Sequence, residues 1–169
     1  MRHFATGVCI ATTYTDQADG RCHDAVTINS LTSVSLDPPL VSLCLRVESN
    51  FLADLLTTKK WAVSVLDSSA CDLARLLARD RASRAATVST LAASPGRHTG
   101  ALVLDAVNWL ECVLWDNFDV GDHTLVVGEV VAIAADRRGA PLIFLHGRYH
   151  TLEEAQPLAR LSNPAAVST

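Results

Sequence analysis

Residues 27–39 hold a dense group of small hydrogen-bonding side chains. The polar members are Thr27, Asn29, Ser30, Thr32, Ser33 and Ser35, and the segment closes at Asp37-Pro38-Pro39. Burying such groups without partners would cost about 1–3 kcal/mol each. They therefore face either water or a ligand that is itself rich in donors and acceptors. From these residues alone, a solvent-facing edge strand with a turn before the prolines is an equally good interpretation.

The segment that follows favours a ligand. A helix is predicted over 50–58, beginning at Ser49-Asn50, either of which can cap its first turn. A helix start offers free N–H groups and a favourable dipole to an anion. Lys59 and Lys60 come one short helix later, although such a pair taken alone is better explained as solvated surface. Hydroxyls for a heterocycle and sugar chain, with a helix start and lysines for a phosphate, together predict a nucleotide-cofactor site.

Two further segments carry side chains that can do chemistry. His123 follows Gly121-Asp122 directly before the longest apolar strand, so Asp122 can orient its ring; a structural histidine is the simpler alternative. Arg148 and Tyr149 can bind a phosphate or stack on a ring. On spacing alone, a strand-end turn with exposed polar groups is the preferred interpretation of that second segment.

Several function classes are disfavoured. The sequence has no GxGxxG, P-loop, GxSxG or HExxH motif. Its five scattered cysteines include no CxxC pair, so no metal site is expected and the thiols are interpreted as reduced. A net charge of −4 without a basic stripe argues against nucleic acid and anionic membranes. With no signal peptide or transmembrane segment apparent, a cytoplasmic location is expected.

Apolar segments separated by turn signals predict the strands that must position these side chains. They are 6–13, 25–30, 40–46, 61–66, 110–116, 124–135 and 142–146. Many strands without βαβ alternation favour an antiparallel barrel or sandwich. The continuously apolar residues 125–135 imply burial on both sides, as in a closed barrel packed against a second subunit.

Helices are expected to be few. Besides 50–58, helices are predicted over 69–81 and 153–160, and 82–100 is expected to be partly helical or a mobile loop. The chain of 169 residues suits one domain over 1–152, followed by the short helix and tail of 153–169.

Several short motifs lie between residue 4 and residue 150: Phe4-Ala5-Thr6-Gly7-Val8, the segment from Thr27 to Val41, Cys44-Leu45, Trp61-Ala62-Val63, Gly121-Asp122-His123-Thr124, Gly128-Glu129-Val130 and Gly147-Arg148-Tyr149. Through these motifs the chain resembles the short-chain flavin reductase family. The segment 27–41 combined with the later GDHT and GEV motifs is highly specific, whereas either part alone is only suggestive.

The resemblance implies a fold and an activity. The fold is mainly β, a six- to seven-stranded antiparallel split β-barrel (Greek key) with a few short helices, assembled as a homodimer. The activity is an NAD(P)H:flavin oxidoreductase that reduces FMN or FAD with NADH or NADPH and supplies reduced flavin to a partner monooxygenase. Hydride transfer is carried by the cofactors, so the protein needs only to stack, orient and stabilise them.

Site residues follow from the same resemblance. The isoalloxazine and ribityl contacts fall on Thr27, Asn29, Ser30, Ser33, Val34 and Ser35, with Ser33–Ser35 expected as a turn. The ribityl-phosphate contacts fall on Cys44, Leu45, Ser49 and Asn50, and Lys60 joins the cofactor-binding set. His123, as nicotinamide contact or proton relay, and Arg148 with Tyr149 border the nicotinamide.

The chain also departs from the family pattern. Phe51 stands where a hydroxyl is usual in the phosphate-binding stretch, and Ser64 stands where an asparagine is usual. These departures keep two alternatives open. One is a non-catalytic flavin or haem binder on the same barrel, and the other is a biosynthetic enzyme repurposed from the flavin reductase fold.

Overall fold

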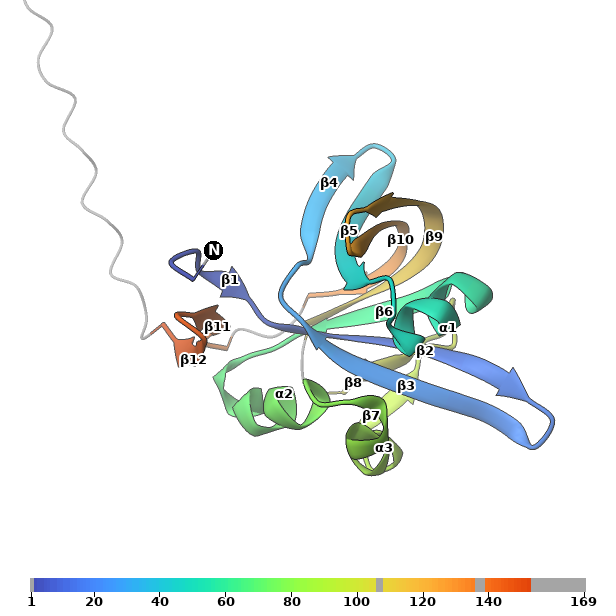
Figure 1. Cartoon of the computed structure of the whole chain (residues 1–169), viewed down its shortest axis with the longest axis horizontal. Coiled ribbons are helices and arrows are strands. Elements are labelled where there is room, and N and C mark those ends of the chain that lie inside the picture. Colours follow the sequence, from blue (N-terminus) through green and yellow to red (C-terminus); the bar gives the residue numbers. More distant parts are fainter. Residues whose placement is uncertain (1, 106–107, 136–138, 153–169) are drawn as a thin grey trace, which may run out of the picture.

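An antiparallel sheet of seven strands forms the body of the computed structural model, which describes residues 2–105, 108–135 and 139–152 (Figure 1). Its strands are β2 (Cys9–Gln17), β3 (Gly20–Ile28), β4 (Thr32–Leu36), β5 (Pro39–Arg46), β6 (Lys60–Val65), β9 (Asn108–Val120) and β10 (His123–Ala134). Their order is β3-β2-β6-β9-β10-β5-β4, so the hydrogen-bonded sheet has β3 at one edge and β4 at the other. The prediction of a mainly β, antiparallel protein with few helices is confirmed.

Two smaller sheets complete the strands of the described ranges. β1 (Thr6–Gly7), β11 (Leu142–Leu145) and β12 (Arg148–Thr151) form a three-stranded sheet in the order β1-β11-β12. β7 (Ala93–Pro95) pairs with β8 (Leu102–Leu104). In Figure 1 the β11–β12 hairpin and the N-terminal segment lie together, on the side away from the tip of the β2–β3 hairpin. The chain therefore brings its first described residues next to its last.

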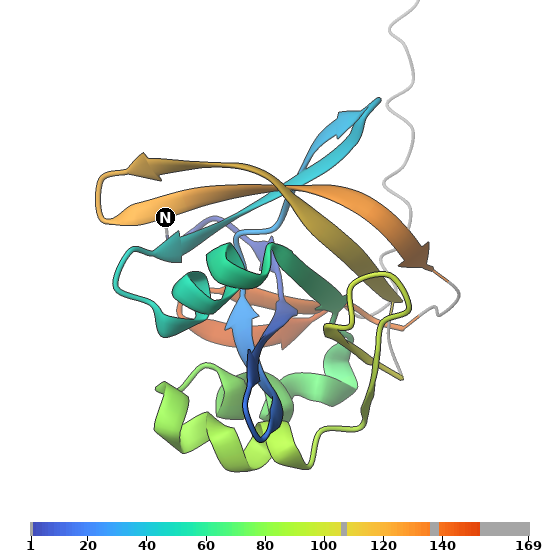
Figure 2. The same ribbon diagram turned by 90° about the vertical axis from the view of Figure 1, so that its right-hand side faces the viewer.

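Helices cover the sheet at two places (Figure 2). α1 (Asn50–Thr58) matches the predicted 50–58 and buries its apolar side against the sheet. The predicted 69–81 is instead a short 3₁₀ helix, η1 (Ser68–Ala70), followed by α2 (Cys71–Leu77), and the chain turns before α3 (Arg81–Ser89). Asp80 starts α3, because its carboxylate accepts a hydrogen bond from the Ser83 amide. The expectation of partial helix within 82–100 is confirmed, while the predicted helix 153–160 lies outside the described residues.

The main core lies between α1 and the sheet. Phe51, Leu55, Trp61, Leu43 and Val126 are fully buried there. Gly128 has no side chain because a Cβ at that position would lie 2.5 Å from Cζ2 of Trp61. A second cluster, with Leu66, Leu77 and Leu104 at its centre, joins α2 to the other side of the sheet.

Burial along β10 differs from the expectation for residues 125–135. Val126 and Val127 are buried, but Val131 is 37% exposed and Ile133 is 62% exposed. Both side chains lie on the same side of β10, because every second residue of a strand faces the same side. The single chain therefore leaves this side of β10 open, and its coverage by a second subunit stays a prediction.

Candidate functional site

A cleft opens where the end of β3, the end of β5 and the start of α1 meet. Its volume is about 400 Å³, within the range of ligand pockets. It is lined by Val26, Thr27, Ile28, Asn29, Ser30, Cys44, Leu45, Arg46, Ser49, Ala78 and His123. We call it the main cleft. Half of the predicted cofactor contacts come together in this lining, from segments far apart in the sequence: Thr27, Asn29, Ser30, Cys44, Leu45, Ser49 and His123.

Asn29 connects the main cleft to its neighbours. A second cavity of about 570 Å³ shares Asn29 and Ser30 with the main cleft and continues along Phe4, Thr6 and Val65. Asn29 is exposed, and its amide nitrogen donates a 3.2 Å hydrogen bond to Thr6 Oγ1. Among the described residues its side-chain oxygen has no partner, so this amide keeps an acceptor for a ligand.

The hydroxyl segment divides into two roles. Thr27 Oγ1 donates to the Ala74 carbonyl at 2.7 Å and so attaches β3 to α2. Ser30 Oγ donates to the Cys44 carbonyl at 3.2 Å and accepts from the Cys44 amide at 3.1 Å. These two hydroxyls therefore fix the walls of the main cleft, while each oxygen keeps further acceptor capacity.

Ser33, Val34 and Ser35 do not form the expected turn. They belong to β4, the edge strand, and the pairing with β5 shifts register between Ser33 and Ser35. Such a bulge turns successive side chains away from regular alternation, and Val34 is 53% exposed. The interpretation of residues 27–39 as an edge strand therefore holds for the second half of that segment. Thr32, at the start of β4, lines the second cavity.

The start of α1 is free to bind an anion. Ser49 occupies the cap position in an extended conformation, but its side chain makes no capping hydrogen bond, and the first turn has no acidic residue. Asn50 is the first helical residue and does not line the cleft. Backbone donors and the helix dipole are therefore available at this end.

The cation of the main cleft is Arg46 and not Lys60. Arg46 ends β5, lines the cleft and accepts a 2.9 Å hydrogen bond from the Ser49 amide on its carbonyl. Lys60 begins β6, beyond the C-terminal end of α1, and lies outside the lining. The sequence feature that could have indicated Arg46 is its place at the end of a predicted strand, a few residues before the helix start.

His123 reaches the same cleft from β10. Its backbone pairs with Arg46 in the β10–β5 ladder. Its Nδ1 lies 2.7 Å from Asp122 Oδ1, the contact expected from the sequence. The hydrogen bond to His123, and then the charge of that ring, lower the pKa of Asp122 below its usual value. Asp122 therefore stays ionised and holds one ring nitrogen, which leaves Nε2 directed elsewhere.

Arg148 and Tyr149 lie apart from the main cleft, on β12 of the small sheet. The Tyr149 ring meets Phe144 edge-on at 5.4 Å and lies 5.8 Å from the Arg75 guanidinium. Burial raises the pKa of Tyr149. The structure thus does not bring this pair to His123. The neighbouring His146 and Gly147 line a separate cavity, which Asn29 also lines.

The two departures from the family pattern are core residues. Phe51 is fully buried under α1, so its side chain does not enter the main cleft. Ser64 is also fully buried, and its Oγ accepts a 3.1 Å hydrogen bond from the Leu104 amide. Neither residue reduces the polar groups of the cleft.

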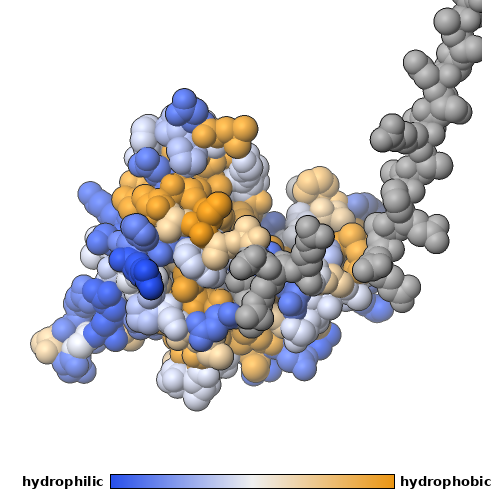
Figure 3. Space-filling model, turned by 180° about the vertical axis from the view of Figure 1, so that it is seen from behind, coloured by the Kyte–Doolittle hydropathy of each residue, from blue (hydrophilic) through white to orange (hydrophobic). Residues whose placement is uncertain are grey.

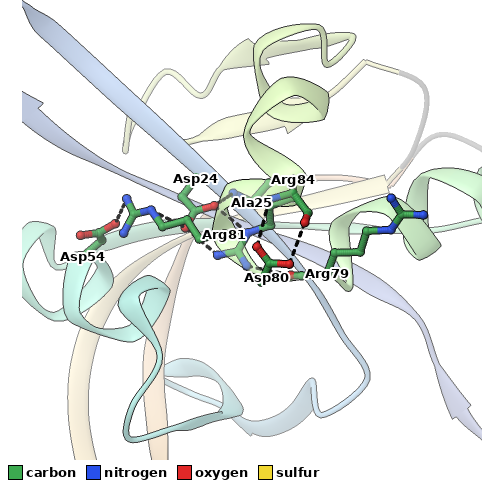
Figure 4. Close-up of polar contacts among 8 residues, drawn as sticks. Asp24, Ala25, Asp54, Arg79, Asp80, Arg81 and Arg84 are labelled. Carbon is green, nitrogen blue, oxygen red and sulfur yellow. Dashed lines mark hydrogen bonds and ion pairs between the residues drawn. The ribbon is translucent and has the colours of Figure 1, made fainter.

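A buried ion-pair cluster holds the helical side of the cleft, a feature that sequence reasoning missed (Figure 4). Arg84 of α3 forms two hydrogen bonds with Asp24 of β3, at 2.9 and 2.7 Å, and both side chains are buried. Arg81 bridges this cluster to α1 through a 2.6 Å contact with Asp54. The sequence feature that could have indicated this cluster is the spacing of Arg81 and Arg84 after the helix cap Asp80. The cluster fixes the α2–α3 connection, whose Ala78 lines the main cleft.

Metal-binding clusters and membrane-spanning helices were also sought within the described ranges. No three His, Cys, Asp or Glu side chains there gather in a way that could hold a metal ion. None of the helices in those ranges has the length and apolarity to cross a membrane. Fold and cleft define the class of the protein: an antiparallel β protein with a polar cleft beside a free helix start.

Comparison with known proteins gives the family. The model of the flavin reductase like domain matches residues 1–153. A probable flavin reductase of Rhizobium meliloti (strain 1021) is 35% identical over 129 residues, which are 76% of this chain and 40% of that protein. The NADH-dependent flavin reductase StyB of Pseudomonas fluorescens is 34% identical over 154 residues, covering 87% of this chain and 83% of StyB.

A solved structure agrees. The crystal structure of BorF, the flavin reductase component of a bacterial two-component tryptophan halogenase, matches with a TM-score of 0.81 and 32% identity. The match covers 91% of this chain and 94% of that one. This chain belongs to the flavin reductase like family, as the sequence resemblance indicated.

Proposed function

We propose that this protein is an NAD(P)H:flavin oxidoreductase that reduces FMN or FAD and supplies the reduced flavin to a partner monooxygenase. The observation that carries the proposal is the main cleft, in which Asn29, Ser30 and His123 line one space with a free helix start. The relatives StyB and BorF, by their names, are flavin reductases, and BorF is one component of a two-component system.

The cleft fits a flavin nucleotide at both ends. Small polar groups at Asn29 and Ser30 suit the heteroatoms of the ring and the ribityl chain. Ser49, the first amides of α1 and the Arg46 guanidinium suit a phosphate, because they combine N–H donors with positive charge. When bound, the flavin supplies the hydride-accepting nitrogen of the reaction.

His123 is the side chain for which we propose a catalytic role. Asp122 holds its Nδ1, so Nε2 is the nitrogen available to contact a nicotinamide or to relay a proton. No nucleophile is required, because the residues need only bind and orient two cofactors and exclude water. Arg148 and Tyr149 would contribute only if the nicotinamide extends toward the small sheet.

We propose a homodimer in which a second copy covers the exposed apolar face and closes the split barrel. Apolar side chains gather on the face turned away in Figure 1, over the end of the molecule where β4, β5, β9 and β10 lie (Figure 3). Exposed apolar residues of these strands include Leu36, Phe118, Val120 and Ile133. Exposed apolar surface of this kind is typical of protein interfaces.

The compartment is proposed from the thiols. The five cysteines at positions 9, 22, 44, 71 and 112 are all free. Unpaired cysteines are typical of reducing compartments, so a cytoplasmic location is consistent with a supply of NADH or NADPH.

Flavin-dependent turnover is the direct test. Purified protein should oxidise NADH or NADPH when FMN or FAD is added, well above the rate with free flavin alone. Bound flavin without any such oxidation would replace the proposal with a non-catalytic flavin binder. In an active protein, His123→Ala should lower turnover while flavin affinity is retained; unchanged turnover would remove His123 from the mechanism.

A further inference from the structure

A cavity at the β7–β8 hairpin lies on the side of the sheet away from the main core. Its volume is about 570 Å³, and its lining includes Pro95, Val103, Asp105, Trp109 and Glu111. Glu111 pairs with Ala62 of β6, whereas the next residue along β9, Cys112, belongs to the main core on the opposite side. We call this space the hairpin cavity. It shares no lining residue with the main cleft, so it is distinct from the site proposed for the flavin.

The two carboxylate oxygens of Glu111 are used differently. The side chain is buried, and its Oε2 accepts hydrogen bonds from the His98 amide at 2.9 Å, the Thr99 amide at 2.7 Å and the Thr99 hydroxyl at 2.8 Å. Oε1 is buried as well, and within the described ranges no group donates a hydrogen bond to it. A buried carboxylate oxygen without a donor is costly. A donor on a molecule in the hairpin cavity, which Glu111 lines, would remove that cost.

The loop that wraps Glu111 is held in place. The Gly96 amide donates to the Ala101 carbonyl at 2.8 Å, and the Tyr14 hydroxyl donates to the Thr99 carbonyl at 2.9 Å. A Cβ at position 96 would clash with the carboxylate of Glu111, so this close approach requires glycine. The acceptor is therefore fixed before any ligand binds, which lowers the entropy cost of binding.

Charge and shape narrow the class of ligand. Two carboxylates line the hairpin cavity, from Glu111 and Asp105, against one guanidinium, from the exposed Arg97. Asp105 is exposed and accepts a 3.0 Å hydrogen bond from the Ser94 hydroxyl, which leaves it capacity for further donors. Trp109 lies two residues before Glu111 on β9, so both side chains lie on the same side of the strand. Acceptor oxygens beside an indole ring suit a cation attached to a flat apolar group.

We propose that the hairpin cavity binds a protonated aromatic amine, whose N–H groups donate to Glu111 Oε1 while its ring lies against Trp109. Asp105 adds a second negative charge to the lining. This inference goes beyond the proposed function, because none of the proposed flavin or nicotinamide contacts lies in this cavity. The proposed cofactors carry phosphate groups, whereas this second site selects for positive charge.

Phenethylamine is the probe, because it joins a primary ammonium to a phenyl ring. Isothermal titration of the wild-type protein should show saturable binding. The N,N,N-trimethyl derivative of phenethylamine keeps the charge but has no N–H, so it should bind about tenfold more weakly. Glu111→Gln should weaken phenethylamine binding about tenfold as well, because the glutamine oxygen can keep the bonds to the loop while its NH₂ group replaces Oε1. Trp109→Leu should weaken it about threefold through loss of the cation–π contact.

Asp19→Asn is the matched control. Asp19 is exposed between β2 and β3, outside the hairpin cavity, and its substitution changes the net charge as much as Glu111→Gln does. If phenethylamine fails to bind the wild type, or if Glu111→Gln and Trp109→Leu both keep its affinity within about twofold, the inference is overturned. Should thermal unfolding show that Glu111→Gln does not fold, Trp109→Leu and the trimethyl probe decide the outcome.

Discussion

Two polar clusters, one on β3 and one just after its end, differ in how their hydrogen bonds are used. In the first, the Asp24 carboxylate is buried and is bound by Arg84 and by the Ala25 amide, so little capacity is left over. In the second, a few residues further on, Asn29 is exposed and keeps an acceptor free beside the main cleft. A polar cluster with satisfied, buried bonds holds the fold, whereas one with exposed capacity is suited to bind a ligand.

The largest expected effect is a loss of stability on breaking the first cluster, the buried Asp24–Arg84 pair. Arg84→Ala would leave the Asp24 carboxylate buried with the Ala25 amide and, as its nearest cation, the more distant Arg81 guanidinium, 3.7 Å away. We expect the free energy of unfolding, measured by urea titration, to fall by about 3–5 kcal/mol. The double variant Asp24→Leu with Arg84→Met should lose less, because no lone charge stays buried. A single variant as stable as the wild type would contradict a structural role.

A substitution in the second cluster, at Asn29, should change ligand affinity and not stability. Asn29→Ala should weaken flavin affinity about tenfold, because amide hydrogen bonds to the ligand are lost, and it should leave stability nearly unchanged. Fluorescence titration with FMN and urea unfolding measure the two quantities. Gln17→Ala removes another exposed amide at the far end of β2 and serves as the control. Loss of stability without loss of affinity would place Asn29 with the structural cluster.

The cation at the phosphate end can be tested by comparing two residues. Arg46→Gln should weaken FMN binding about fivefold, roughly 1 kcal/mol for an exposed ion pair. Riboflavin, which lacks the phosphate, should bind both proteins equally. Lys60→Gln should change neither affinity, because Lys60 lies outside the main cleft. A larger effect from Lys60 than from Arg46 would restore the assignment expected from the sequence.

The smallest expected effect is a pH dependence of stability, which arises at the cap of α3 and not in the cleft. The Ser83 hydroxyl and amide hold the pKa of Asp80 below 3.8. A lowered folded pKa means that the carboxylate stabilises the fold above pH 3.8, and that this stabilisation is lost as the pH falls through the folded pKa.

Thermal unfolding at about pH 6 and about pH 3 measures that loss. Asp80→Asn should match the wild type at the higher pH, since asparagine also caps helices, and should lose less on acidification. An identical acid response in both proteins would show that Asp80 does not contribute to it.

Much of this arrangement could be predicted from the sequence. The main strands and the helix 50–58 follow from apolar periodicity and a clear cap position, and Asn29, Ser30 and His123 were expected in one site. Local patterns succeed there because each element buries one continuous apolar side.

The misses arise from contacts between distant residues. Lys60 is close to the helix start in sequence, but α1 places it at the opposite end, while Arg46 lies beside His123 through strand pairing. Ser33–Ser35 was expected to be a turn from the family resemblance, yet pairing with β5 makes it a bulged strand. The Asp24–Arg84 pair joins residues 60 positions apart, and no local pattern reports that separation.

The position of Cys44 makes the main cleft accessible to chemical modification. Its thiol is exposed on the cleft wall, whereas burial raises the pKa of both Cys9 and Cys112 to about 12 and keeps those thiols unreactive. Cys22 is exposed on the β2–β3 hairpin, outside the cleft. The ratio of alkylation at Cys44 to that at Cys22 therefore measures occupancy of the cleft in an unlabelled protein, without a chromophore and without turnover.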